Sequence, residues 1–159
     1  MRDMGAQAAP MNAFLLNIGL ETLHLRVPRH CDNALTLAKF LDDNDKIEWV
    51  NYPGLENNEY YSLAQKYMPN GSSGVVSFGV RGVRKAAEKL MESLELAAMV
   101  VHVADARTSV LHPASTTHRQ MTDEQLHECG ISPNMIRLSV GIEDIDDILA
   151  DFKQALEKI

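Results

Sequence analysis

The amino-acid sequence predicts one α+β domain, in which an antiparallel sheet of about four strands carries helices on one face and follows a long N-terminal helix. Segments with a helical apolar period are interspersed with short segments rich in β-branched and aromatic residues. The two kinds of segment do not alternate strictly, as they would around a parallel sheet. The length of 159 residues suits a single domain, residues 1–159, with its own buried core.

The N-terminal part of the chain is predicted to be helical from Pro10 to about Leu41, with a kink or break at Pro28. The first half of this helix is apolar nearly all round, through Phe14, Leu15, Leu16, Ile18, Leu20, Leu23 and Leu25. A helix of that kind is normally buried on most sides. We therefore expect residues 1–45 to form a helical entry segment that contacts a partner surface missing from this chain.

The remaining elements follow from local patterns. β-branched and aromatic residues concentrate in four segments, which predicts strands at 47–52, 75–80, 99–103 and 134–140. Apolar residues at helical spacing predict helices at 59–67, 83–94 and 142–159. The last helix is the clearest, and we expect it to pack on the sheet through Ile145, Leu149, Phe152 and Leu156.

The composition argues against several classes of partner. The formal net charge is −7, and no run of basic residues exceeds Arg84-Lys85, so nucleic-acid binding is not expected. The apolar stretch near the N-terminus is too short and too polar to span a membrane, and it does not have the features of a signal peptide. Cys31 and Cys129 have no CxxC spacing and are expected to be free, buried thiols in a reducing compartment. A cytoplasmic protein is predicted.

Polar residues are densest between 102 and 120. A metal site built from this stretch would use His102, Asp105, His112 and His118, but their spacing matches no common zinc pattern. A hydrolase site would use Ser115 with a histidine and Asp105, but no GxSxG motif surrounds the serine. From composition alone, the favoured interpretation is a surface loop whose histidines face solvent.

Arg137 lies in the last predicted strand. Side chains alternate along a strand, so Ile136 and Leu138 should face the core while Arg137 and Ser139 point the other way. A guanidinium beside a small residue suits bidentate binding of a carboxylate. The alternative is an arginine that lies in solvent and binds nothing.

Several segments, in this order, resemble the cystathionine and methionine metabolism enzymes that use pyridoxal phosphate. The matching segments are 12–16, 19–23, 50–55, 74–78, 105–120 and 137–143. The segment Asp105–Gln120 is most similar to the branch of O-acetylhomoserine sulfhydrylases. The resemblance covers essentially the whole chain.

The resemblance implies a fold type I enzyme in which a large domain holds the cofactor and this chain is the small carboxy-terminal domain. It implies that Arg137 holds the α-carboxylate of an amino-acid substrate. His102 would lie near that carboxylate, at a position where many relatives carry serine or asparagine. Ser115, Thr116, Thr117 and His118 would border the active site. Homo-oligomers are also expected.

The resemblance leaves one requirement unmet. The family lysine that forms the Schiff base lies in a Ser/Thr-rich motif followed by an aromatic residue and glycines, and no lysine of this chain has that setting. We therefore expect a piece of a longer enzyme that binds pyridoxal phosphate only when complete, with no catalytic residue and no covalent cofactor here. The expected activity is transfer of an aminocarboxypropyl group to sulfide or a thiol. The alternatives are a γ-synthase, a γ-lyase, or a non-catalytic folding and dimerisation module.

Overall fold

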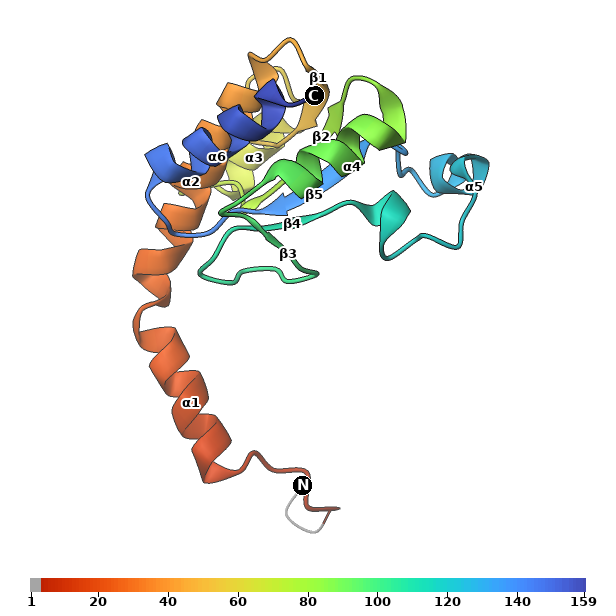
Figure 1. The fold of residues 1–159 in the computed structure, drawn as a ribbon. Helices are drawn as coiled ribbons and strands as arrows, with labels where there is room; N and C mark the ends of the chain where they lie inside the picture. Colours follow the sequence, from red (N-terminus) through yellow and green to blue (C-terminus); the bar gives the residue numbers. More distant parts are fainter. Residues whose placement is uncertain (1–3) are drawn as a thin grey trace.

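A five-stranded mixed sheet lies at the centre of the structure, a computed structural model that describes residues 4–159 (Figure 1). The strands are β1 (Ile47–Asn51), β2 (Val75–Val80), β3 (Ala98–Met99), β4 (Ser109–Leu111) and β5 (Met135–Ser139). Their spatial order is β1-β2-β5-β4-β3, with every neighbouring pair antiparallel except β3 and β4. The α+β class is confirmed, whereas the purely antiparallel sheet of about four strands is wrong.

Both errors arise in one part of the sheet. β4 lies inside the stretch that was predicted to be a loop. It was not predicted as a strand, because three residues are too few to show an alternating pattern. Predicted strand 99–103 is reduced to Ala98–Met99, and Val101 and Val103 are 59% and 57% exposed. The three residues of β4 are buried instead, and they pair with both β3 and β5.

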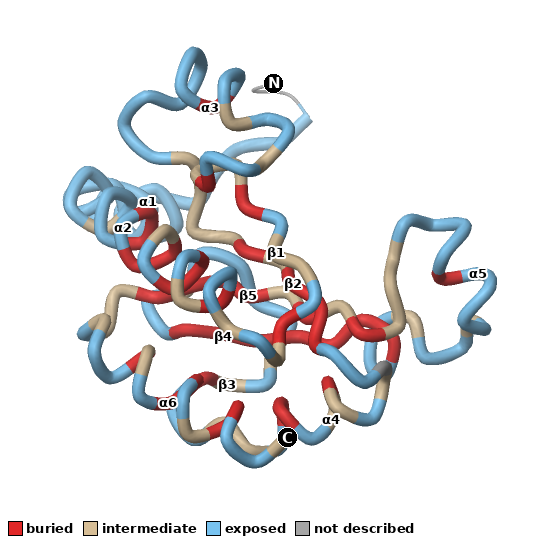
Figure 2. Tube along the Cα trace, turned by 90° about the horizontal axis from the view of Figure 1, so that it is seen from above, coloured by how far each residue is buried: buried red, intermediate tan, exposed pale blue. Residues whose placement is uncertain are grey.

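Three helices form a layer on one face of the sheet (Figures 1 and 2): α2 (Leu23–Asp42), α4 (Val83–Ser93) and α6 (Ile145–Glu157). The core lies between this layer and the sheet. Phe78 of β2 and Phe152 of α6 are fully buried, and their rings meet edge to face with centroids 6.5 Å apart. The predicted packing of the last helix is confirmed, since Phe152 and Leu156 are buried and Ile145 and Leu149 lie against them.

The opposite side of the sheet is called the open face here. Strand register and alternation assign to it Trp49, Asn51, Val75, Ser77, Gly79, Ser109, Leu111, Met135, Arg137 and Ser139. The short helix α3 (Tyr61–Tyr67) lies beside the β1–β2 end of this face, where the two line a pocket of about 480 Å³. The other helices leave the open face uncovered.

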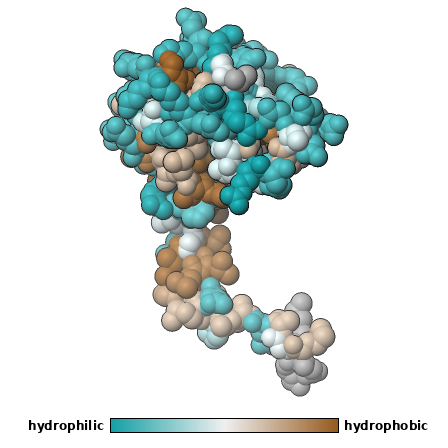
Figure 3. Space-filling model, turned by 45° about the vertical axis from the view of Figure 1, so that its right-hand side comes forward, coloured by the Kyte–Doolittle hydropathy of each residue, from teal (hydrophilic) through white to brown (hydrophobic). Residues whose placement is uncertain are grey.

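The chain enters the domain through an arm, defined as residues 10–27. It comprises α1 (Pro10–Glu21) and the start of α2, and it leads away from the body on the side opposite α4 and α6 (Figures 1 and 2). No residue of α1 is buried, and the arm forms an apolar column in Figure 3. Contact of the entry segment with a further domain stays a prediction.

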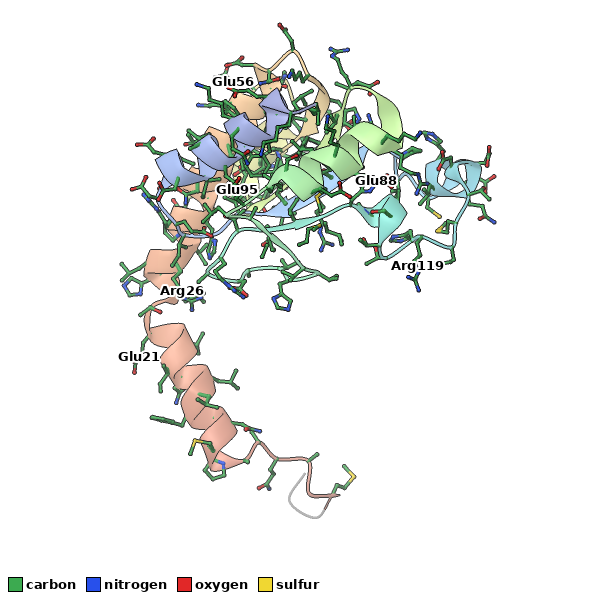
Figure 4. The ribbon with its side chains drawn as sticks, viewed as in Figure 1. Glu21, Arg26, Glu56, Glu88, Glu95 and Arg119 are labelled. Atoms are coloured by element: carbon green, nitrogen blue, oxygen red, sulfur yellow. The ribbon has the colours of Figure 1, made fainter. Side chains whose placement is uncertain are left out.

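The break in the entry helix was wrongly placed at Pro28. The chain bends at Thr22, and Pro28 lies inside α2. The Arg26 guanidinium donates to the Thr22 hydroxyl at 3.2 Å and to the Gly19 carbonyl at 2.5 Å, which joins the two helices across the bend. Figure 4 shows Glu21 and Arg26 on either side of it.

The segment between β4 and β5, called the excursion, extends away from the sheet. It contains the 3-10 turn η2 (Pro113–Ser115) and the helix α5 (Asp123–Glu128), neither of which was predicted. α5 begins with a capping box between Thr122 and Gln125. Of the two cysteines, Cys31 is buried as expected, but Cys129 follows α5 and is exposed. Within residues 4–159, no helix combines the length and apolarity needed to cross a membrane.

Candidate substrate-carboxylate site

Arg137 lies at the middle of β5 on the open face. Its neighbours across the two adjoining ladders are Ser77 of β2 and Leu111 of β4. The side chain is half-buried, and no side-chain hydrogen bond or ion pair links its guanidinium to another residue of 4–159. The placement predicted from strand alternation is confirmed. A cation held this way has its forked donors available for an anion.

The segment from Val100 to Thr108, called the His102 loop, covers the open face next to Arg137. The backbone N–H of Ala104 donates to the hydroxyl of Ser139 at 3.0 Å, and Ser109 Oγ donates to the carbonyl of His102 at 3.2 Å. Ser109 and Ser139 are themselves cross-strand partners. Because Ser139 follows Arg137 by two residues on the same face, these bonds hold the loop beside the arginine.

His102 is exposed, and its side chain turns back onto its own loop. Its Nδ1 lies 3.3 Å from Asp105 Oδ2, while Asp105 Oδ1 accepts the backbone N–H of Arg107 at 3.0 Å. The pKa of the Asp105 carboxyl is lowered below its ordinary value. The largest cause is the hydrogen bond from the Arg107 backbone N–H, and the next is the hydrogen bond with His102. The structure therefore brings the backbone of His102, rather than its ring, onto the Ser139 end of the open face.

The predicted border residues lie at the other end of β4. Ser115, Thr116 and Thr117 are exposed and His118 is half-buried, in the turn that begins with η2. The Thr116 hydroxyl donates to the carbonyl of His112 at 2.7 Å, and Thr117 Oγ1 lies 2.9 Å from His118 Nδ1. Since Leu111 pairs with Arg137, this turn and the His102 loop leave β4 in opposite directions from the arginine.

His112 is buried, contrary to the expectation that the histidines of this stretch face solvent. Its Nε2 donates to the Pro133 carbonyl at 2.8 Å, so its Nδ1 accepts from the Ser115 hydroxyl, also at 2.8 Å. Burial lowers the pKa of the imidazole below its ordinary value, opposed by the Pro133 hydrogen bond. The neutral histidine holds the base of the excursion against the sheet.

The two alternative sites drawn from this stretch are not assembled. His102 pairs with Asp105, while His112 is buried between Ser115 and Pro133, so the four residues of the metal alternative do not converge. Within the described residues, no group of three or more His, Cys, Asp or Glu side chains could hold a metal ion. The hydrolase alternative gains the Ser115–His112 contact, but a backbone carbonyl stands where a carboxylate would orient the histidine.

A cavity of about 360 Å³ adjoins the Ser139 end of the open face. Val103, Ala104 and Ser139 line it on the side of the His102 loop, and His30 and Cys31 of α2 line it on another. The His30 Nδ1 donates to the carbonyl of Val140 at 2.6 Å, just beyond the Arg137 strand. The cavity therefore lies beyond the Ser139 end of the open face, and Arg137 itself does not line it.

The lysines of this chain do not fit a pyridoxal-phosphate Schiff base. Six of the seven are exposed, and the half-buried Lys46 donates to the carbonyls of Leu156 and Ile159, both at 2.8 Å. A Schiff-base lysine needs an enclosed site beside a phosphate cradle. The pocket lined by Lys39 also contains Asp42 and Glu56, whose carboxylates would repel a phosphate.

Sequence reasoning missed two residues that shape the site, Thr108 and Glu143. The Glu143 carboxylate accepts both the backbone N–H and the hydroxyl of Thr108, at 2.5 and 2.9 Å. Glu143 lies in segment 137–143, which carries the resemblance, but no role was predicted for its side chain. Its partner is 35 positions away in the sequence, and no local pattern joins them.

Comparison with known proteins places the chain in a family. Residues 1–157 match the model of the Cys/Met metabolism PLP-dependent enzymes. The chain is 50% identical over 157 residues to a homocysteine synthase of Schizosaccharomyces pombe and 45% identical over 160 residues to an O-acetyl-L-homoserine sulfhydrylase of Leptospira meyeri. These matches cover 99% and 100% of the chain but 37% and 36% of the relatives.

A solved structure shows the same fold. The chain superposes with a TM-score of 0.87, at 43% identity, on a crystal structure from Campylobacter jejuni described as that of an O-acetylhomoserine (thiol)-lyase. That structure contains N'-pyridoxyl-lysine-5'-monophosphate, and the match covers 98% of this chain and 37% of the other. The chain therefore spans little more than a third of the length of the relatives it matches. It belongs to the Cys/Met metabolism family of pyridoxal-phosphate-dependent enzymes.

Proposed function

We propose that this chain is the carboxy-terminal domain of an O-acetylhomoserine sulfhydrylase, and that it supplies the arginine that binds the substrate α-carboxylate. The complete enzyme transfers an aminocarboxypropyl group to sulfide or a thiol. The observation that carries the proposal is Arg137, a half-buried guanidinium on the sheet face that carries no helix over β5, with no side-chain hydrogen bond or ion pair to another described residue. The sulfhydrylases among the relatives support the reaction class.

Arg137 acts by binding and orientation. Its planar fork can donate two parallel hydrogen bonds to a carboxylate, which fixes the rotation of the amino acid as well as its position. The Ser139 side of the site is closed by the His102 loop, and the Ser115–His118 turn lies beyond the other end of β4. An amino acid held by its carboxylate would therefore extend its side chain away from the sheet.

The rest of the enzyme supplies what this chain does not. The proposed large domain brings the lysine and the phosphate cradle, and it packs on the arm and the open face. The arm lies on the side of the sheet opposite α4 and α6 (Figure 1), and strand register assigns Arg137 to that same open face, so a domain covering the arm would also face the arginine. We include homo-oligomer formation and a cytoplasmic location in the proposal.

A lyase is the second candidate, because the chain is 41% identical to an L-methionine gamma-lyase of Fusobacterium nucleatum. Product analysis separates the two. The full-length enzyme should form homocysteine from O-acetylhomoserine and sulfide faster than it forms methanethiol from methionine. The opposite ranking would assign the lyase instead.

The role of Arg137 is tested by Arg137→Lys in the full-length enzyme. Loss of the bidentate geometry should lower kcat/KM for every amino-acid substrate at least about tenfold, which corresponds to roughly 1.4 kcal/mol. Cofactor absorbance should be unchanged. Arg119→Lys is the matched control, since Arg119 is exposed and points away from the body (Figure 4). An unchanged kcat/KM in Arg137→Lys would mean that the arginine lies in solvent and binds no substrate.

A further inference from the structure

The end of the Arg137 strand is tied to the His102 loop by one carboxylate and one hydroxyl. The Thr108 hydroxyl donates to Glu143 Oε2 at 2.9 Å and accepts the backbone N–H of Gly141 at 2.9 Å. The Thr108 N–H donates to Glu143 Oε1 at 2.5 Å. Both carboxylate oxygens of Glu143 are therefore occupied by a single residue of the loop.

The backbone around the Thr108–Glu143 contact is closely packed. A Cβ on Gly141 would overlap Glu143 Oε2 and would lie 2.5 Å from both the Ala106 carbonyl and the Thr108 N–H. The Ile142 N–H donates to that same Ala106 carbonyl at 2.9 Å. The loop and the strand end are thus in direct backbone contact, and the carboxylate lies across the glycine.

Helix α2 supports the tie from the other side. The Asn33 amide donates to the carbonyls of Gly141 and Glu143, at 3.0 Å each, and Arg29 donates to the Glu143 carbonyl at 3.3 Å. These contacts fix the backbone that carries the Glu143 side chain. Glu143 is therefore held by a rigid element while its carboxylate holds a loop.

The loop needs to be held, because its conformation is strained. Ala104 has a φ of +63°, the only positive φ outside glycine in residues 4–159. Backbone in such a conformation persists only where its surroundings impose it. The loop is tied to the Arg137 strand at Ser139, and to the residues just after that strand by the bonds of Ala106 and Thr108.

We propose that Glu143, acting through Thr108, is a positioning residue that fixes the His102 loop against the Arg137 strand and so sets the shape of the carboxylate site. The inference rests on the proposed function, in which Arg137 binds the substrate carboxylate. Neither Glu143 nor Thr108 contacts the substrate. A misplacement of about 1 Å at a binding group can lower a rate by about two decades, so the support of the loop bears directly on catalysis.

The test compares Thr108→Val with Thr108→Ser in the full-length enzyme. Valine keeps the size but removes the hydroxyl that bonds both Glu143 and Gly141, whereas serine keeps it. Deuterium exchange of peptides covering residues 100–108 and 139–143 should be at least about tenfold faster in Thr108→Val and unchanged in Thr108→Ser. KM for the amino-acid substrate should rise about tenfold in Thr108→Val, with a smaller change in kcat, and serine should restore it.

Glu143→Gln gives the same comparison if Thr108→Val fails to fold, since glutamine keeps the shape but loses an acceptor oxygen. Unchanged exchange of the loop in either variant would overturn the proposal. So would faster exchange with an unchanged KM, provided that Arg137→Lys raises KM in the same assay. If Arg137→Lys itself leaves KM unchanged, it is the carboxylate site that is wrong, and this inference falls with it.

Discussion

Ala104 donates its backbone N–H to the hydroxyl of Ser139, 3.0 Å away, while its φ of +63° lies in the region that disfavours residues with a Cβ. Ser139 stands two residues after Arg137 on the same face of the sheet. One hydrogen bond thus joins the strained residue of the His102 loop to the strand of the candidate site. The strain at Ala104 can be tested by measuring stability, without any assay of activity.

Ala104→Gly should raise the free energy of unfolding by about 0.5–1 kcal/mol. Glycine relieves a left-handed conformation that costs an L-residue roughly 1–2 kcal/mol, and part of that gain is offset by the greater freedom of glycine in the unfolded chain. Urea denaturation measures the difference. Ala106→Gly is the matched control, because Ala106 is an exposed alanine of the same loop without a positive φ, and it should give no stabilisation.

Phe152→Ala should lower the free energy of unfolding by about 3–5 kcal/mol, because the ring is fully buried and packs edge to face on Phe78. Leu149→Ala on the same helix should cost less than half as much, since Leu149 is only partly buried. Both are measured by denaturant unfolding. A loss below about 1 kcal/mol in Phe152→Ala would contradict the packing of α6 on the sheet.

The success of the α6 prediction has a physical reason. α6 and β2 each bury one side, and the buried residues recur with a regular apolar period that can be seen in the sequence. The predicted bounds of β2, Val75–Val80, are the observed ones. β4 has only three residues, and it is buried because loops and neighbouring strands cover it, which no local pattern records. The bend at Thr22 rather than Pro28 depends on contacts of Arg26 with the preceding turn.

The candidate site also has features that a local sequence pattern predicts and features that it does not. Arg137 could be placed on the correct face because alternation along a strand is a local property. The tie between Thr108 and Glu143 joins residues 35 positions apart, and the burial of His112 depends on a carbonyl 21 positions away. Such contacts come from tertiary structure, and the sequence alone does not reveal them.

His112→Gln should reduce the dependence of stability on pH between about pH 5 and 7. Burial places the pKa of His112 below its ordinary value, so the unfolded chain binds this proton more readily than the folded chain does. The contribution of His112 is therefore complete above about pH 6.5 and decreases as the pH falls below that value. Denaturant unfolding at the two pH values measures it.

The control is His127→Gln, since His127 is an exposed histidine of α5. Its pH dependence should match that of the parent chain. Equal pH dependence in His112→Gln and the parent would show that His112 titrates alike in the folded and unfolded states. That result would contradict the buried, neutral histidine at the base of the excursion.

The arm should make the isolated 159-residue chain self-associate. Its apolar side chains lie in solvent: Phe14, Leu15, Leu16 and Ile18 are 58%, 59%, 66% and 46% exposed. Figure 3 shows the arm as an apolar column that the body does not cover on this face. Contiguous apolar surface of this kind drives association when its partner surface is absent. Sedimentation equilibrium at about 10–100 µM should therefore detect dimers or larger species, a range typical of weak association.

The double variant Phe14→Glu/Ile18→Lys should return the chain to a monomer. The two positions are four residues apart on α1, so the new charges stand as a Glu–Lys pair that supports the helix while removing its apolar surface, and the net charge is unchanged. Leu63→Glu/Tyr67→Lys places the same pair at the same spacing on α3, where the parent residues are 52% and 69% exposed. This control should associate like the parent, because it leaves the apolar surface of the arm intact. A parent chain that stays monomeric throughout the concentration range would show that the arm needs no partner. If both double variants were equally monomeric, the contact that drives association would lie on the body rather than on the arm.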